Sequence, residues 1–475
     1  MNNYLYKKES LLRSLLERKG IYSINQALEL LKNKTNTSAL ALEKISFSDL
    51  KGWYFNDEFG DIRHKTGKFF QIQGFEIKII ENNREIKWSQ PIINQPEIGF
   101  LGCLTKEING ILYFLIQAKV EPGNINSAQY SPTLQATRSN FTQEHRGAKP
   151  PYLSEFMNIE DSLVLSDQLQ SEHGTRFLKK RNRNLIIFNK EIRYDPESFI
   201  WLTLAQIKEL CKLDNIINMD LKSVIGSLNL SFDPDLLRRI YKEYSLKENS
   251  FGYKMLNSLS NKNFNIEKKI FIESWLSNHK FNNNIELKKL PINELQDWEF
   301  EDKEISHYSD KFFSVNWISV NIKGREVLKW DQPIFEVKDI GIICFFTRFI
   351  NGSYYFLVQA KKEFGLIDSI ELGPTIMATP SNYNNPEKEI PFYKYFCSIP
   401  KKDYKFNAIS SEEGGRFLRD QNEHIIIECK ENFKEDIPNN FLWISYIQLM
   451  ELMLNTNTVN VQARTLLSSI NYCEG

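Results

Sequence analysis

The apolar positions of the chain follow two spacings, and each predicts a different element. Residues 10–20 (SLLRSLLERKG) place leucines at helical spacing and end at a glycine, which predicts a helix. Residues 68–80, 111–120 and 184–190 are short runs rich in Phe, Ile and Tyr, which predict strands. Residues 201–213 (WLTLAQIKELCKL) return to helical spacing. The first half of the chain therefore indicates a helical lead-in, several strands and a closing helix.

The same succession occurs twice in the chain. Residues 117–140 (QAKVEPGNINSAQYSPTLQATRSN) and 359–382 (QAKKEFGLIDSIELGPTIMATPSN) align without a gap, and thirteen of the twenty-four positions are identical. KWSQP is likewise repeated as KWDQP, and SEHGTRFL (171–178) as SEEGGRFL (411–418). A period of about half the chain indicates a duplicated domain and not a solenoid.

The two copies predict three segments. The first repeat is expected in residues 1–230 and the second in 286–475. Residues 231–285 are polar, have helical character and carry no repeat motif, which predicts a helical connector. Each repeat mixes strands with helices, so the expected fold class is α+β with a mixed or antiparallel sheet.

Composition narrows the class of protein. Among 475 residues, 60 Lys and Arg balance 60 Asp and Glu, so charge gives no support for binding to nucleic acid or to a membrane. No apolar run is long enough to span a bilayer, and the N-terminus lacks the features of a secretory signal. The six cysteines are scattered without a CxxC pair, and no histidines pair at metal-ligand spacing. We therefore expect a cytoplasmic protein with reduced thiols and without a metal site.

One segment concentrates polar chemistry. After the strand at 111–120 the chain runs for some thirty residues without helical or strand periodicity, and a loop of that length in a compact domain is usually functional or disordered. Its mixed composition and its preservation between the copies favour function. Its donors, acceptors and acid–base groups suit a sugar ligand and proton transfer; they are Gln117, Lys119, Glu121, Tyr130, Thr133, Gln135, Thr137, Ser139, Asn140 and His145. For Pro122, Gly123, Asn124 and Pro132, turn formation is the better interpretation.

A second segment, RFLKKRNRN (176–184), is cationic. It holds five cations within eight residues: Arg176, Lys179, Lys180, Arg181 and Arg183. Guanidinium groups match the geometry of phosphate oxygens, so the cluster could hold a diphosphate. A solvated, charged strand edge is an equally simple interpretation of any single member.

The second copy keeps the frame and loses much of this chemistry. Lys180, Arg181 and Arg183 are replaced by Asp420, Gln421 and Glu423. Pro122 becomes Phe364, Tyr130 becomes Leu372, and His145 aligns with Glu387, as the aligned segments show. The hypothesis is that both copies preserve a fold and that the first copy carries the chemistry.

The long motifs QAKVEPGN, QYSPTLQATRSNF, LQSEHGTRFLKKRNRN, SEEGGRF and VQARTLL resemble those of the nucleotide-hexose 2,3-dehydratases of deoxysugar biosynthesis, the NDP-hexose 2,3-dehydratase family. The resemblance covers nearly the whole chain. It implies that each half is a Nudix-hydrolase-like α/β/α domain, that the halves arose by tandem duplication, and that the protein is a homodimer. It also implies one catalytic and one vestigial pocket, and the copy comparison assigns the working pocket to residues 40–225.

The resemblance implies an elimination without a cofactor or metal. The substrate would be a dTDP-4-keto-6-deoxyhexose, whose C3 proton is acidic because the C4 ketone stabilises an enolate. A base would remove this proton, an acid would protonate the departing C2 hydroxyl, and donors would hold the C4 oxygen. The 3,4-diketo-2,6-dideoxyhexose formed would pass to a partner 3-ketoreductase.

Residue roles follow from the motifs that match the family. The proton-transfer candidates are His145, Glu121, Tyr130 and Glu172. His145 titrates nearest neutral pH. Glu121 and Glu172 have counterparts in Glu363 and Glu412, so a structural role stays open for both. The substrate-binding candidates are Gln117, Lys119, Thr133, Gln135, Thr137, Ser139, Asn140, Arg176, Arg181 and Arg183. Trp53 and Trp88 could stack on a base, but both are repeated in the second copy, which favours core packing.

Two other functions are compatible with this outline. A Nudix-type nucleotide-sugar pyrophosphohydrolase would need a helix with the carboxylate pattern REuxEExGu to hold Mg²⁺, and neither half contains it. A non-catalytic nucleotide-sugar binding protein would need no acid or base, and the charged loop of the first copy argues against it.

Overall fold

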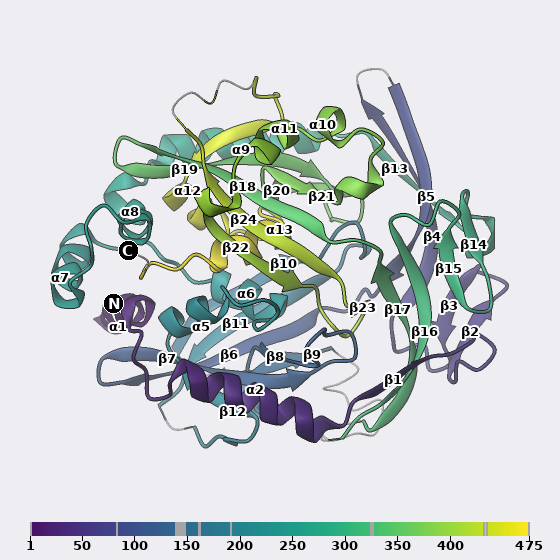
Figure 1. Cartoon of the computed structure of the whole chain (residues 1–475), viewed down its shortest axis with the longest axis horizontal. Helices are drawn as coiled ribbons and strands as arrows, with labels where there is room; N and C mark the ends of the chain where they lie inside the picture. The colour runs from purple at the N-terminus through teal and green to yellow at the C-terminus, as the bar shows by residue number, and fades with distance from the viewer. Residues whose placement is uncertain are drawn as a thin grey trace.

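The computed structural model describes residues 2–81, 84–137, 149–159, 163–190, 192–323, 327–430, 433 and 436–473. Helices and several sheets are intermixed, which confirms the α+β class. In Figure 1 the large sheet of the first repeat lies below and that of the second above. Helices α6 and α13 lie between them, and the strands of two smaller sheets stand at the right. No helix among the described residues is long and apolar enough to cross a membrane.

The elements of the first repeat are α1 (Asn2–Leu16), α2 (Ile24–Ser38), β1 (Ala41–Lys44), β2 (Trp53–Asn56), β3 (Asp61–His64), β4 (Gln71–Glu81), β5 (Arg84–Asn94), β6 (Gly99–Ile108), β7 (Ile111–Val120), β8 (Ala128–Ser131), β9 (Leu134–Ala136), α4 (Leu153–Met157), β10 (Leu163–Ser171), β11 (Arg181–Phe188), β12 (Phe199–Leu202), α5 (Leu204–Leu210) and α6 (Met219–Gly226). Helices α7 (Pro234–Tyr244), α8 (Phe251–Ser258) and α9 (Ile266–Phe281) follow in the region expected to be the connector.

The elements of the second repeat are β13 (Ile285–Leu290), β14 (Trp298–Phe300), β15 (Glu304–His307), β16 (Phe313–Asn321), β17 (Lys329–Val337), β18 (Gly341–Ile350), β19 (Ser353–Lys362), β20 (Ile370–Gly373), β21 (Ile376–Ala378), α10 (Pro386–Glu389), α11 (Tyr393–Ser398), β22 (Tyr404–Ser411), β23 (Phe417–Leu418), β24 (Gln421–Glu428), β25 (Phe441–Ser445), α12 (Tyr446–Leu452) and α13 (Val461–Ser468). Short 3₁₀ turns are η2 (Asn261–Asn263), η3 (Ile292–Glu294), η4 (Pro380–Asn382) and η5 (Lys401–Asp403).

Each repeat builds the same seven-stranded mixed sheet. In the first repeat the order is β10-β11-β6-β7-β12, with β8 on β7 and β9 on β6. In the second it is β22-β24-β18-β19-β20, with β21 on β18 and β25 on β19. The pairs β11–β6 and β24–β18 are parallel, and the remaining pairs of these two sheets are antiparallel. The sequence left mixed and antiparallel sheets open, and the sheets are mixed.

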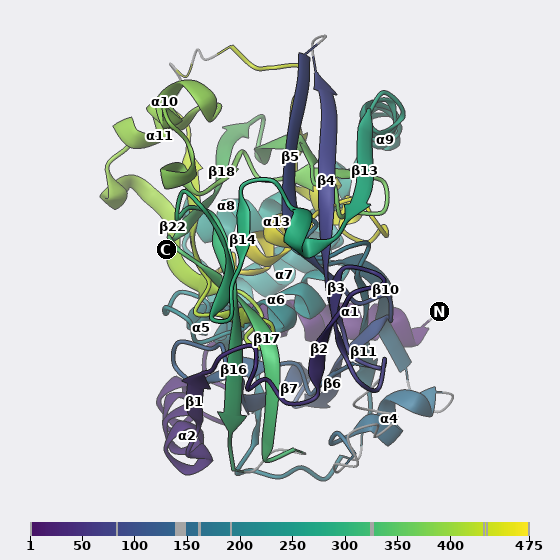
Figure 2. The same ribbon diagram turned by 90° about the vertical axis from the view of Figure 1, so that its right-hand side faces the viewer.

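The repeats exchange their first strands. Strand β1 of the first repeat pairs antiparallel with β16 of the second, with Leu42 opposite Val320. Strand β13 of the second repeat pairs antiparallel with β4 of the first, with Leu287 opposite Ile77. Figure 2 shows β13 alongside β4. Each small sheet is therefore complete only when both repeats are present.

Helices α6 and α13 meet where the two repeats face each other. A Cβ on Gly226 of α6 would lie 2.5 Å from Ser468 Oγ of α13, so the helices approach closely at a position without a side chain. The amine of Lys222 on α6 donates to Ser410 Oγ of the second repeat at 2.8 Å. Reciprocally, Arg464 on α13 donates to the Ser171 carbonyl of the first repeat at 2.6 Å. These buried contacts fix each helix against the strand end of the other repeat.

Two sequence expectations differ from the structure. The helix expected from Trp201 begins at Leu204, because Thr203 forms a capping box with Gln206 and the preceding residues pair with β7 as β12. The loop expected to lack strands contains β8 and β9, which pair with β7 and β6. Their short length and their turn-forming neighbours hide them from a periodicity search.

Candidate active site

A cavity of about 240 Å³ lies at the boundary between the repeats. The first repeat contributes residues from the ends of β7, β9 and β10, from β11 and from the start of α6; the second contributes β17 and the loop before β23. The polar lining consists of Gln95, Lys119, Glu121, Gln135, Thr137, Glu172, Lys180, Asn182, Asp220, Asp331, Gln332, Glu413 and Arg416. The aromatic lining consists of Trp53, His64, Phe69, Phe70, Phe100, Phe177 and Trp330.

One polar network links the end of β7 to the start of α6. Lys119 lies 3.1 Å from the Glu121 carboxylate, and Gln135 donates to the same carboxylate oxygen at 3.1 Å. Asn218 caps α6 through its side-chain oxygen and donates its amide to Gln135 at 3.2 Å. Glu121 therefore accepts from a cation and from an amide.

A second carboxyl follows β10 on the same cavity. Glu172 is buried and accepts a hydrogen bond from Asn182 of β11. Burial, reinforced by the charge of Glu413, raises the pKa of Glu172. Burial and then the charge of Arg416 lower the pKa of the nearby Lys180 amine to about 8. Acidic and basic groups with displaced pKa values thus share one cavity, as active sites commonly require.

The second repeat completes this wall. Arg416 donates to the Gln95 side chain at 2.9 Å and to Glu413 at 2.9 Å. Its loop is tied to the first repeat because the Gly123 amide donates to the Gly414 carbonyl at 2.7 Å. A Cβ on Gly123 would lie 1.7 Å from the Phe417 carbonyl oxygen, so the close approach requires glycine.

The aromatic wall also joins both repeats. Trp53 of β2 donates its indole N–H to the Asp331 carbonyl of β17 at 2.8 Å, and Trp330 precedes that residue. His64 packs edge-on against Trp53, with ring centroids 5.3 Å apart. Burial, followed by the charge of Lys65, lowers the pKa of His64. Trp53 and Trp330 therefore border the cavity, and Trp53 also packs in a core cluster, the role that the sequence favoured for Trp53 and Trp88.

Asp220 is a cavity residue that the sequence reasoning missed. It lies in the first turn of α6 and is 3% exposed. Burial raises its pKa well above the usual value; the charges of Glu172, Glu413 and Glu121 add to the shift, and Lys119 opposes it. A usable signal existed in the repeat: residues 224–228 (VIGSL) align with 466–470 (LLSSI), and the same offset pairs Asp220 with Gln462.

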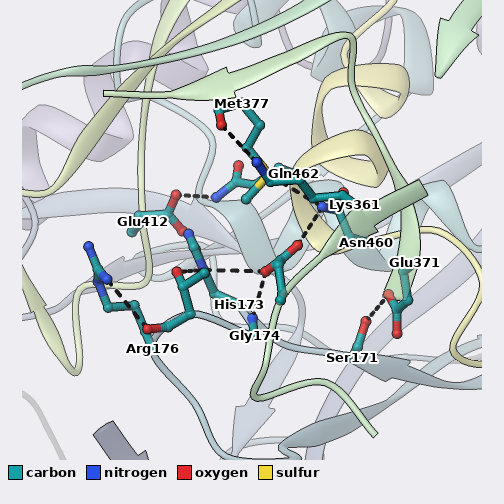
Figure 3. Close-up of polar contacts among 12 residues, drawn as sticks. Ser171, His173, Gly174, Arg176, Lys361, Glu371, Met377, Glu412, Asn460 and Gln462 are labelled. Atoms are coloured by element: carbon teal, nitrogen blue, oxygen red, sulfur yellow. Dashed lines mark hydrogen bonds and ion pairs between the residues drawn. The ribbon is translucent and has the colours of Figure 1, made fainter. Parts of the chain in front are cut away.

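The equivalent place in the second repeat is sealed by amides and apolar groups. Gln462 donates to Glu412 at 2.5 Å, and Asn460 donates to Glu363 at 2.7 Å. Figure 3 shows Gln462 pointing at Glu412, and Lys361 reaching the Met377 carbonyl. Met377 stands where the first repeat has Gln135. The carboxyls here are held by partners within the protein.

The side chain that fills this second place is Phe364. It belongs to an apolar cluster with Phe75, Ile77 and Ile92. Its ring also packs edge-on against Trp88, with centroids 6.1 Å apart. Trp88 is the counterpart of Trp330, so the contact replaces the open side of the first cavity with packed rings.

Five of the residues that the sequence selected line the cavity: Lys119, Glu121, Gln135, Thr137 and Glu172. Three others lie outside the described residues: Ser139, Asn140 and His145. The remaining six, Gln117, Tyr130, Thr133, Arg176, Arg181 and Arg183, are absent from the lining.

The structure explains why several of these point elsewhere. Tyr130 is fully buried and donates its hydroxyl to the Ala27 carbonyl at 2.7 Å, under α2. Thr133 bonds the backbone of β6 and β7. Arg176 crosses to the second repeat and lies 4.2 Å over the Phe313 ring. Arg183 forms an exposed ion pair with Asp167 at 2.6 Å.

No group of three His, Cys, Asp or Glu side chains within the described ranges is arranged to hold a metal ion. The lining of the cavity displays hydrogen-bond donors and acceptors, acids and cations. A cavity with aromatic walls and several acids suits binding of a polar molecule with a flat ring, and proton transfer to it.

Comparison with known proteins supplies the family. The model of the NDP-hexose 2,3-dehydratase family matches twice, at residues 24–228 and 270–470. A protein of Saccharopolyspora spinosa named dTDP-4-dehydro-6-deoxy-alpha-D-glucopyranose 2,3-dehydratase is 36% identical over 445 residues, covering 93% of this chain and 90% of that protein. Proteins with the same name from Amycolatopsis orientalis and Streptomyces violaceoruber are 35% identical (92% of this chain, 88% of that protein) and 33% identical (90% and 93%). The chain belongs to the NDP-hexose 2,3-dehydratase family.

Proposed function

We propose that this protein removes the C2 hydroxyl and the C3 proton of a dTDP-4-keto-6-deoxyhexose as water. The observation that carries the proposal is the cavity between the repeats, where aromatic walls adjoin a buried set of acids and cations. The names of the three relatives support the substrate class. The product would be a 3,4-diketo-2,6-dideoxyhexose still linked to the nucleotide.

Glu121 is the base that we assign. Its ion pair with Lys119 and its bond from Gln135 keep it an acceptor. It takes the C3 proton, and the electron pair of the C3–H bond moves toward the C4 oxygen. The Lys119 ammonium is placed to stabilise the enolate oxygen that forms. Expulsion of the C2 oxygen then gives a C2–C3 enol, which takes a proton at C2, loses its hydroxyl proton and becomes the ketone.

The nucleotide end is assigned to the cations and rings. Lys180 and Arg416 are the cavity cations that remain beside Glu172 and Glu413, and they suit the diphosphate. Trp53, Trp330 and the neighbouring phenylalanines offer flat surfaces for the base. This assignment differs from the sequence hypothesis, which gave the diphosphate to Arg176, Arg181 and Arg183.

The wider setting follows from the product and the fold. A 1,2-diketone is reactive, so a 3-ketoreductase that consumes it is the expected partner. Six free cysteines support a reducing compartment such as the cytoplasm. The repeated mixed sheets support two Nudix-like domains, and homodimer formation, expected from the family, is measurable by light scattering.

The test is a trapped reaction. Purified protein is incubated with dTDP-4-keto-6-deoxyglucose and EDTA, with a 3-ketoreductase and NADPH added, and products are read by mass spectrometry. Loss of one water together with uptake of two hydrogens is the expected result. Recovery of intact substrate despite measurable binding would favour a binding protein. Release of dTMP only after Mg²⁺ is restored would overturn the proposal in favour of a pyrophosphohydrolase.

A further inference from the structure

Asp220 occupies a position in the cavity where the two repeats differ in chemistry. Its side chain lines the cavity from the first turn of α6. The counterpart helix α13 begins after its own asparagine cap, Asn460, and carries Gln462 at the equivalent place. An amide that cannot titrate thus stands in the sealed repeat, and a carboxyl stands in the open one.

The contact made by Gln462 indicates what Asp220 faces. Gln462 donates to Glu412 at 2.5 Å, and Glu412 is the counterpart of Glu172. In the first repeat Glu172 receives the amide of Asn182, and the Asp220 carboxyl replaces the second amide. Asp220 and Glu172 line the same buried cavity, and the charge of Glu172 acts on Asp220. Two carboxyls placed in this way repel each other when both are ionised, and protonation of one of them removes the repulsion.

The other charged groups around Asp220 favour its protonated form. Asp220 experiences the charges of Lys119 in β7, of Glu121 just after β7 and of Glu413 in the second repeat. Three carboxyls, counting Glu172, oppose one ammonium. The start of α6 would favour a negative charge, but burial and the carboxyls outweigh it, since the pKa of Asp220 is raised well above its usual value.

Glu121 and Asp220 thus have opposite environments within one cavity. Glu121 accepts from Lys119 and Gln135, whereas Asp220 faces further carboxyls. Separated environments of this kind divide two carboxyls into a base and an acid. Abstraction of the C3 proton requires a base, and protonation of the departing C2 hydroxyl requires an acid.

We infer that Asp220 is the general acid that protonates the departing C2 hydroxyl, with Glu172 as the positioning residue that keeps it protonated. This inference rests on the proposed dehydratase function. As the C2–O bond breaks, its electron pair goes to the oxygen, and the Asp220 proton joins it to release water. Asp220 is left as a carboxylate beside Lys119, and Glu121 holds the C3 proton. Exchange of protons with solvent restores both groups.

The test separates proton abstraction from elimination in Asp220→Asn. The variant and the wild type are incubated with dTDP-4-keto-6-deoxyglucose in D₂O, and deuterium at C3 and trapped dehydrated product are measured by mass spectrometry. We expect the variant to return substrate deuterated at C3 while its elimination rate falls about 100-fold or more, as removal of a general acid typically does. Glu121→Gln is the matched control and should lose both exchange and elimination.

A second variant and three further outcomes decide whether the inference holds. Asp220→Ala with formate added is the second variant, and partial recovery of elimination is expected because formic acid can deliver the proton. Elimination by Asp220→Asn within about tenfold of the wild type would overturn the inference, given the 10²–10⁴-fold usual for an acid. Loss of both exchange and elimination with dTDP binding unchanged would overturn it too. If the wild type itself eliminates no water, the proposed function fails, and not the role of Asp220.

Discussion

Pro122 and Phe364 occupy equivalent positions after the same strand of the two repeats, and their side chains have opposite effects on the space beside them. Pro122 borders the cavity, whereas Phe364 packs against Trp88 in an apolar cluster. A proline ring leaves room next to Trp330, and a phenyl ring at the same place does not. This single difference accounts for much of the contrast between an open and a filled site.

Pro122→Phe should close the working cavity without unfolding the protein, because the second repeat already accommodates phenylalanine there. We expect kcat/KM to fall by about 100-fold or more, since a misplaced substrate loses catalysis steeply. Steady-state kinetics and dTDP binding by calorimetry measure the effect. Phe364→Leu is the control: it should reduce stability by about 1 kcal/mol and leave kcat/KM within a few-fold. Normal substrate binding by Pro122→Phe would contradict the assignment of this cavity.

Arg416 and Arg176 are counterparts that separate the structural assignment of the diphosphate from the sequence hypothesis. Arg416 lines the cavity from the second repeat, whereas Arg176 lies over Phe313. Arg416→Gln should raise KM by about 10- to 100-fold, because a charge-assisted hydrogen bond contributes about 1.5–3 kcal/mol. Arg176→Gln should change KM little. Both variants are compared at matched folded fraction, checked by circular dichroism. A larger KM effect in Arg176→Gln would restore the sequence hypothesis.

Tyr130→Phe tests whether the phenol takes part in proton transfer. The hydroxyl is buried against the Ala27 carbonyl, so its removal should lower the free energy of unfolding by about 1 kcal/mol. We expect kcat to stay within about twofold of the wild type, because no acid–base step is removed. Urea unfolding followed by fluorescence gives the first quantity, and the trapped assay gives the second. A kcat reduced a hundredfold would return Tyr130 to the list of acids.

Lys180 should give the activity an alkaline limit. Burial, then Arg416, lowers its pKa to about 8, so the free enzyme loses this charge as the pH rises through that value. If Lys180 holds the diphosphate, kcat/KM falls above pH 8 while kcat changes less, because bound diphosphate retains the proton. Lys180→Arg keeps its charge, and its kcat/KM should stay flat across the same range.

The lowered pKa of Lys180 affects stability in the opposite direction: as the pH rises, it increases the free energy of unfolding although it decreases activity. Between pH 8 and the ordinary lysine range, the unfolded chain binds the proton that the folded protein has released. The contribution of Lys180 to the free energy of unfolding therefore rises with pH in that window. Urea midpoints of the wild type and Lys180→Arg, measured at several pH values, check the sign.

The sequence predicted the repeat and the polar end of β7, and it could do so from local signals. Lys119 lies near the end of β7, Glu121 directly follows that strand, and Gln135 lies in β9. Both copies contain this segment, which marks the three residues as one unit. Tyr130 also belongs to that unit, but β8 pairs with β7 and directs the phenol into the core. Burial of one polar side chain within a polar segment has no local signature.

The cavity residues that sequence reasoning missed are far from the main loop along the sequence. Trp330 of β17 and Arg416 of the loop before β23 reach the cavity from the second repeat, and Arg176 crosses in the other direction. Motifs within one copy do not reveal such crossings, because the two copies have similar motifs whether a segment contacts its own repeat or the other one. Asp220 lies about seventy residues beyond the main loop, and it stands out only when the helices at the ends of both repeats are aligned.

The exchange of β1 and β13 has a consequence for how the chain comes into being. Strand β4 gains its β13 neighbour only after residues 285–290 have left the ribosome, roughly two hundred residues later, and β1 must wait for β16. Pairings of such long sequence separation form slowly, and an unpaired strand edge is exposed to association until they do. The first repeat therefore cannot complete its strand pairing while it is being synthesised. Selection on folding alone would keep the second repeat in the chain, whatever became of its chemistry.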